Sequence, residues 1–96
     1  MIGLDTTVLV AYELQEVAGH VAVRAAVQEA SRSGLGRFAL APQVVREFLH
    51  VVTDPRRFAQ PLAFSEALSR VRFWWESSDV EVCFPNARSE GLVLQL

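Results

Sequence analysis

Two acidic residues, Asp5 and Glu47, have neighbours that could give them a chemical role. Asp5 follows an apolar run at residues 2–4 and precedes two hydroxyl residues, Thr6 and Thr7. Ligands of open α/β sheets bind beyond the carboxyl ends of the strands, so an aspartate at the end of a first strand is well placed for function. A carboxylate followed by two hydroxyls could hold a hard divalent cation or orient a water bound to it.

Each acid also has a purely structural interpretation. Aspartates often cap the helix that follows them, because the carboxylate accepts a hydrogen bond from a backbone N–H of the first turn. Considered alone, Asp5 is better explained as such a cap. At about 100° per residue, Glu47 lies beside Val44 and Val51 at the edge of an apolar helical stripe, where it is either a ligand or a solvated residue. The spacing of Asp5 and Glu47 in the sequence does not establish that they converge.

Composition excludes several classes of protein. The 96-residue chain has room for one small domain, is 51% hydrophobic and has a net charge of −2, so we expect neither disorder nor a DNA-coating protein. Cys83 is the single cysteine, which excludes an intramolecular disulfide. No apolar run reaches the roughly 20 residues that span a bilayer, and the N-terminus lacks the pattern of a signal peptide. We therefore expect a cytoplasmic protein without a membrane segment.

The apolar pattern predicts strands that alternate with helices. The predicted strands are residues 2–4, 38–40 and 80–84, and the predicted helices are residues 13–33, 42–53 and 65–76, with a further helix opening near residue 89. This order predicts an α/β fold with a central parallel sheet covered on both sides. Three strands are few for such a sheet, and the chain ends on a further apolar stretch, so we expect the fold to be incomplete at the C-terminus.

The third predicted helix contains two adjacent tryptophans, Trp74 and Trp75. The two tryptophans belong to a helical stripe, which favours core packing of both; the stripe consists of Phe64, Leu68, Val71 and Trp75 and is flanked by Ala67 and Trp74. The alternative is a protein-binding surface, because aromatic residues are enriched among interface anchors.

Two segments of the chain resemble motifs of the PIN-domain family. Residues 2–10, Ile-Gly-Leu-Asp-Thr-Thr-Val-Leu-Val, look like the opening strand of PIN domains. Residues 40–49, Leu-Ala-Pro-Gln-Val-Val-Arg-Glu-Phe-Leu, look like their second motif, in which a strand leads through a proline into a helix that carries the second acid. Residues 51–62, with Arg56 and Arg57, are similar to the VapC-type toxin branch. These segments follow one another in the family's order over nearly the whole chain.

The resemblance implies a PIN-like three-layer α/β/α fold and a Mg²⁺- or Mn²⁺-dependent endoribonuclease of a type II toxin–antitoxin system, inhibited by an antitoxin and often dimeric. By position, Asp5 and Glu47 would be catalytic acids that bind the metal, and the metal would activate water for attack on an RNA phosphodiester. Thr6 and Thr7 would be supporting hydroxyls, with Thr7 in place of the more usual Asn or Ser. The family's third and fourth acids have no counterpart here. Residues 1–96 are therefore expected to be the N-terminal two-thirds of a single PIN-like domain with impaired catalysis.

Other functions remain open at this point. A non-catalytic PIN remnant would dimerise or bind an antitoxin without cleaving RNA, and it would tolerate Asp5→Asn, whereas an enzyme would not. The segment from Asp5 to Thr7 is also similar to the nucleophile motif of haloacid-dehalogenase phosphohydrolases, but Thr7 stands where that family needs a second aspartate.

For the origin of the chain we favour an interrupted reading frame. Loss of C-terminal elements would expose apolar surface, so we expect a poorly soluble or oligomeric protein.

Overall fold

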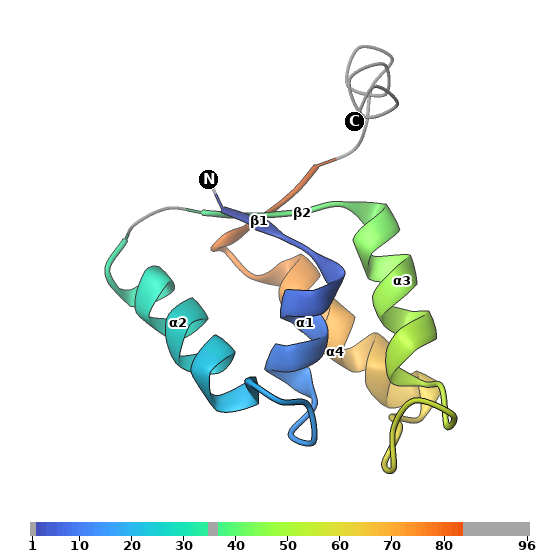
Figure 1. Cartoon of the computed structure of the whole chain (residues 1–96). Helices are drawn as coiled ribbons and strands as arrows, with labels where there is room; N and C mark the ends of the chain where they lie inside the picture. Colours follow the sequence, from blue (N-terminus) through green and yellow to red (C-terminus); the bar gives the residue numbers. More distant parts are fainter. Residues whose placement is uncertain (1, 35–36, 84–96) are drawn as a thin grey trace, which may run out of the picture.

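The computed structural model describes residues 2–34 and 37–83 of the chain (Figure 1). Its elements follow in the order β1 (Ile2–Leu4), α1 (Thr6–Glu13), α2 (His20–Arg32), β2 (Phe38–Leu40), α3 (Pro42–Val52), α4 (Phe64–Glu76) and β3 (Val80–Val82). The predicted α/β class is confirmed. The three predicted strands all form, and they belong to one parallel sheet.

The sheet buries one of its faces beneath the helices. Its strands lie in the order β1-β2-β3, and the first and last residues of each strand point to the same side because side chains alternate along a strand. The four helices lie on this side of the sheet (Figure 1). The core between sheet and helices includes Leu4, Leu9, Val10, Leu14, Phe38, Leu40, Phe48, Val52, Ala67, Trp74 and Val80.

The opposite face of the sheet carries Gly3, Ala39 and Glu81, which lie side by side in register. Gly3 and Glu81 are exposed, and a Cβ atom added to Gly3 would meet no atom within 4 Å. Right-handed crossovers that advance in one direction, as from β1 to β3, place every connecting helix on the same face. A helical layer on the second face is thus not formed by the described residues, and the helix predicted near residue 89 lies outside them.

The helix predicted over residues 13–33 forms only over His20–Arg32, as α2, and the preceding helix α1 was not predicted. Asp5 caps α1, so this helix begins directly after β1 and already ends at Glu13. Leu14 then has extended backbone angles, and Gly19, the N-cap of α2, has φ 87°. Glycine adopts this left-handed conformation without the steric cost that a Cβ atom imposes. The apolar residues after Gly19 therefore belong to a separate helix.

The helix predicted after β2 is confirmed as α3. Pro42 occupies its first turn, where the missing N–H of proline would have had no partner within the helix. Phe48 and Val52 are 1% and 0% exposed and anchor the helix to the core. The helix ends before Asp54, as predicted from the Asp54-Pro55 pair.

The predicted core packing of the tryptophans is confirmed for Trp74 and wrong for Trp75, and the predicted N-cap at Ser65 is also wrong. The helix begins at Phe64 after an Ala63 N-cap that makes no side-chain hydrogen bond, and its buried residues are Ala67 and Trp74. Phe64, Leu68 and Trp75, which the apolar pattern places in the core, are 59%, 44% and 37% exposed. The physical reason is a polar anchor between α4 and α1, described below, which rotates α4 roughly a quarter turn away from the face that hydrophobicity alone favours.

Candidate metal-binding site

Asp5 lies at the carboxyl end of β1 and caps α1. Its Oδ1 atom accepts a hydrogen bond from the Val8 backbone N–H at 2.9 Å. The capping interpretation of Asp5 is therefore confirmed. The residue is nevertheless exposed, and its second carboxylate oxygen, Oδ2, has no hydrogen bond with any residue in the described ranges. One oxygen thus orients the carboxylate while the other remains available to a ligand.

Glu47 projects from α3 towards the same end of the sheet. The Thr6 hydroxyl Oγ1 donates a hydrogen bond to Glu47 Oε2 at 2.9 Å, although the two residues are 41 positions apart. The contact forms because β1 and β2 are parallel neighbours, so the helix that follows each of them starts at the same sheet edge. Glu47 is exposed and keeps its Oε1 atom without a partner among the described residues. The structure thus brings the second acid next to the residue that follows the first.

The two threonines differ in what they do. Thr6 is half-buried and orients Glu47 through its hydroxyl, as described above. Thr7 is exposed on α1, and its hydroxyl makes no hydrogen bond with the described part of the chain. A supporting role of Thr7 therefore stays a prediction.

The free carboxylate oxygens of Asp5 and Glu47 are hard ligands of the kind that Mg²⁺ and Mn²⁺ prefer. Mg²⁺ keeps several of its waters and is often held by only one or two carboxylates, so the chemistry of the donor set fits this ion. Among residues 2–34 and 37–83, no group of three or more His, Cys, Asp or Glu residues could hold a metal. A metal ion at Asp5 and Glu47 therefore stays a prediction.

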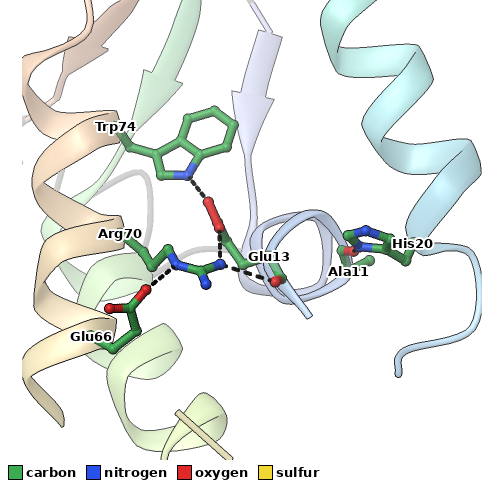
Figure 2. Close-up of polar contacts among 6 residues, drawn as sticks. All are labelled: Ala11, Glu13, His20, Glu66, Arg70 and Trp74. Atoms are coloured by element: carbon green, nitrogen blue, oxygen red, sulfur yellow. Dashed lines mark hydrogen bonds and ion pairs between the residues drawn. The ribbon is translucent and has the colours of Figure 1, made fainter. Parts of the chain in front are cut away.

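A second polar cluster, which the sequence did not reveal, joins α1 to α4 (Figure 2). Glu13 has a side chain only 6% exposed, and its carboxylate accepts hydrogen bonds from Arg70 at 2.8 Å and from Trp74 Nε1 at 2.9 Å. Arg70 also donates to Glu66 at 2.9 Å. The hydrogen bonds to Glu13 and then to Glu66 raise the pKa of the Arg70 guanidinium. Only the i,i+4 spacing of Glu66 and Arg70 was a signal for this cluster in the sequence.

Both arginines of the loop after α3 are paired with Asp54. The Arg56 backbone N–H and its Nε donate to Asp54 Oδ1 at 2.9 and 3.2 Å, and Arg57 Nε lies 3.4 Å from Oδ2. These contacts, first of all the hydrogen bond from the Arg56 backbone, lower the pKa of the Asp54 carboxyl. Asp54 therefore offsets part of the positive charge of these two arginines.

The fold and the site together define an α/β protein with a parallel sheet and an acidic pair at its carboxyl edge. The sequence matches no known family model, and no curated protein is significantly similar to it. Within the described ranges, no helix has the length and apolar character needed to cross a membrane. The particular kind of α/β protein is therefore a matter of proposal, based on the motifs and the geometry of the site.

Proposed function

We propose that the chain is a PIN-like, metal-dependent endoribonuclease of the type II toxin–antitoxin kind, with the three-layer fold of that family. The observation that supports the proposal is the hydrogen bond from Thr6 to Glu47, which links the second acid to the residue that directly follows Asp5. This edge is where open α/β sheets bind their ligands. The proposed reaction, hydrolysis of an RNA phosphodiester, is inferred from the resemblance of residues 2–10 and 40–49 to PIN motifs.

In this proposal the residues at the sheet edge hold a divalent metal ion or orient the side chains that hold it. Mg²⁺ or Mn²⁺, when bound, supplies a Lewis acid and lowers the pKa of a bound water. Asp5 and Glu47 would hold the ion. The α1 cap orients the Asp5 carboxylate, and the Thr6 hydroxyl orients the Glu47 carboxylate. Without a cation, two neighbouring carboxylates would repel the RNA phosphate. With only two of the family's acids, weak metal binding and weak catalysis are expected.

Cleavage of a labelled single-stranded RNA in the presence of Mn²⁺ tests the proposal. We expect cleavage that a chelator abolishes and that Asp5→Asn and Glu47→Gln both remove. Thr6→Val should weaken Mn²⁺ binding by roughly 10–100-fold, the range seen when a partner that orients a metal ligand is lost. Glu76→Gln is the matched control, because Glu76 is an exposed acid that pairs with Arg72 on α4.

Retention of full cleavage in Asp5→Asn would reject Asp5 as a catalytic residue. Mn²⁺ binding that Asp5→Asn and Glu47→Gln leave unchanged would reject the metal site itself. Binding that depends on both acids, in a protein that does not cleave RNA, would retain the site and reject the enzyme.

The second candidate is a non-catalytic module that binds an antitoxin protein or a second copy of the chain. The exposed apolar side chains of Phe64 and Leu68 on α4 favour this function, because apolar surface is typical of protein interfaces. Co-expression with an antitoxin and pull-down would test it. A complex that forms equally well with Asp5→Asn, but not with Leu68→Lys, would support binding without catalysis.

A further inference from the structure

A polar cavity lies away from Asp5 and Glu47, where the end of α1 meets α2 and α4. It has a volume of about 610 Å³, a size typical of small-molecule sites. Its wall combines aromatic, amide and charged side chains rather than apolar ones alone. The lining residues that matter here are Tyr12, Glu13, Gln15, Glu16, Arg24, Gln60, Ser69, Arg70 and Phe73.

The acidic residues of the cavity wall are already engaged. Glu13 is held by Arg70 and Trp74 as described above (Figure 2). Glu16 accepts hydrogen bonds from the backbone N–H groups of Ala59 and Gln60, both at 2.9 Å, and thereby fastens the loop before α4. Because these carboxylates have protein partners, the cavity is poorly suited to a metal ion. The same contacts hold its wall in place before any ligand binds.

Other groups of the cavity have no such partners. The Arg24 guanidinium lies 4.8 Å from the centre of the Tyr12 ring, and no acidic residue in the described ranges pairs with it. The Phe73 ring is 67% exposed. The side chains of Gln15, Gln60 and Ser69 make no hydrogen bonds within the described part of the chain. Phe73 also makes a T-shaped contact with Trp74, with ring centroids 6.4 Å apart. The cavity therefore presents a guanidinium without an acidic partner among the described residues, a largely exposed aromatic ring and several side-chain hydrogen-bonding groups.

These groups match the parts of a single unpaired nucleotide. Exposed aromatic rings and stacked guanidinium groups are the surfaces on which proteins stack unpaired bases. Side-chain amides and hydroxyls bond to base edges, and a guanidinium binds phosphate through charge-assisted hydrogen bonds. Glu13 and Glu16 balance Arg24 and Arg70 in formal charge, so the cavity has no net positive charge that would attract a dense polyanion.

We infer that this cavity binds one nucleotide, with the base on Phe73 and the phosphate on Arg24. The nucleotide is either a free mononucleotide or part of a single-stranded RNA. The inference does not depend on the proposed RNA cleavage, because neither Asp5 nor Glu47 lines the cavity.

Titration of the full chain with 5′-AMP and 5′-UMP, followed by ¹H–¹⁵N NMR spectra, tests this inference. The Asp5→Asn variant serves as the background, so that cleavage cannot disturb the measurement. We expect saturable shifts at the amides that line the cavity. Phe73→Ser and Arg24→Gln should each weaken binding roughly 5-fold or more, the low end of what losing a base stack or a charged hydrogen bond costs.

Three further comparisons sharpen the test. Arg72→Gln is the matched control, since Arg72 is an exposed arginine of α4 that pairs with Glu76 outside the cavity. Uridine, which lacks the phosphate, should bind more weakly and should be insensitive to Arg24→Gln. A short oligonucleotide that binds at least tenfold more tightly than 5′-UMP, with the same sensitivity to the variants, would identify a nucleotide of an RNA strand. Equal affinity would identify the free mononucleotide.

Several outcomes would overturn the inference. The absence of shifts at millimolar nucleotide would do so, as would shifts that neither Phe73→Ser nor Arg24→Gln reduces. Inorganic phosphate that competes as well as 5′-UMP would show an anion site without a base site. Circular dichroism of each variant verifies the fold, and both substituted side chains are largely exposed, so folding is expected to persist.

Discussion

Asp5 accepts a hydrogen bond from the Val8 backbone through one carboxylate oxygen and leaves the other exposed. A single position therefore combines a structural role with a proposed chemical one, and two substitutions separate them. Asparagine caps helices about as well as aspartate, so Asp5→Asn should leave the free energy of unfolding nearly unchanged while it removes a metal ligand. Asp5→Ala should lower the free energy of unfolding by about 1 kcal/mol. Urea unfolding without metal, combined with Mn²⁺ titration, measures both effects.

Equal destabilisation by the two substitutions would contradict the capping role of the Asp5 side chain. Unchanged Mn²⁺ binding by both variants would contradict its role as a ligand. The two results are independent, because one is read without metal and the other with it.

Glu13 is the acidic residue whose loss should cost most stability. Its nearly buried carboxylate is the shared acceptor for Arg70 on one side and Trp74 on the other. Glu13→Ala leaves both donors without this partner and should lower the free energy of unfolding by about 2–3 kcal/mol. Glu13→Gln keeps an acceptor for Trp74 and should cost less. Urea unfolding followed by far-ultraviolet circular dichroism is the suitable measurement, because Trp74 fluorescence would respond to the substitution directly.

Glu66→Ala provides the control for this prediction. Glu66 binds the same arginine, but its side chain is 52% exposed, and exposed ion pairs contribute about 0–1 kcal/mol. An effect of Glu66→Ala as large as that of Glu13→Ala would mean that the position of Glu13 in the core is unimportant.

At the scale of whole elements, α2 is the helix with the weakest attachment. None of its 13 residues is buried, whereas α1, α3 and α4 each contribute residues to the core. Its main fixed points are the 2.7 Å hydrogen bond between the His20 ring and the Ala11 carbonyl (Figure 2) and the 2.6 Å bond from Ser31 to Asp79. Helices with few buried contacts open locally at a lower cost than the global free energy of unfolding.

Hydrogen exchange measures this difference between the helices. The amides of α2 should exchange faster than those of α3, which buries Phe48 and Val52 completely or nearly so. Ser31→Ala should accelerate exchange in α2 further, while Ser69→Ala, a change on α4 that removes no hydrogen bond within the described residues, should leave α2 unchanged. Equal protection of α2 and α3 would show that the chain opens only as one unit.

At the scale of the whole molecule, the free edge of β1 could promote association between copies of the protein. In the described sheet β1 has a neighbour on one side only. Beside it lies an apolar cavity of about 290 Å³, lined by side chains of β1 and α2. Ile2 is 41% exposed at this edge. Unpaired strand edges next to apolar surface promote pairing between molecules.

We therefore expect the protein to self-associate as its concentration rises, and a charge at the edge should reduce this. Ile2→Lys should shift the protein towards monomer, because a charged residue on an edge strand opposes strand addition. Val21→Lys is the control, since Val21 is an apolar residue of α2 that is 80% exposed and does not line the cavity. Size-exclusion chromatography with light scattering measures the mass of each variant. A monomer at all concentrations would contradict the expectation.

The sequence by itself determined the features that depend on local or one-dimensional pattern. The apolar runs of β1, β2 and β3 correctly predicted three parallel strands, but the described residues bury only one face of the sheet. Pro42 marked the start of α3, because proline fits only the first turn of a helix. The alternation of these elements was enough to predict an α/β fold.

Only the tertiary structure decided which distant residues meet. The contact between Thr6 and Glu47 depends on β1 and β2 being neighbours in the sheet, and no spacing in the sequence encodes that order. The face of α4 that is buried depends on Glu13, a residue of another helix, because burying a carboxylate requires the donors of Arg70 and Trp74 beside it. Periodicity describes how apolar one face of a helix is, but the polar partners that a neighbouring element needs can outweigh it.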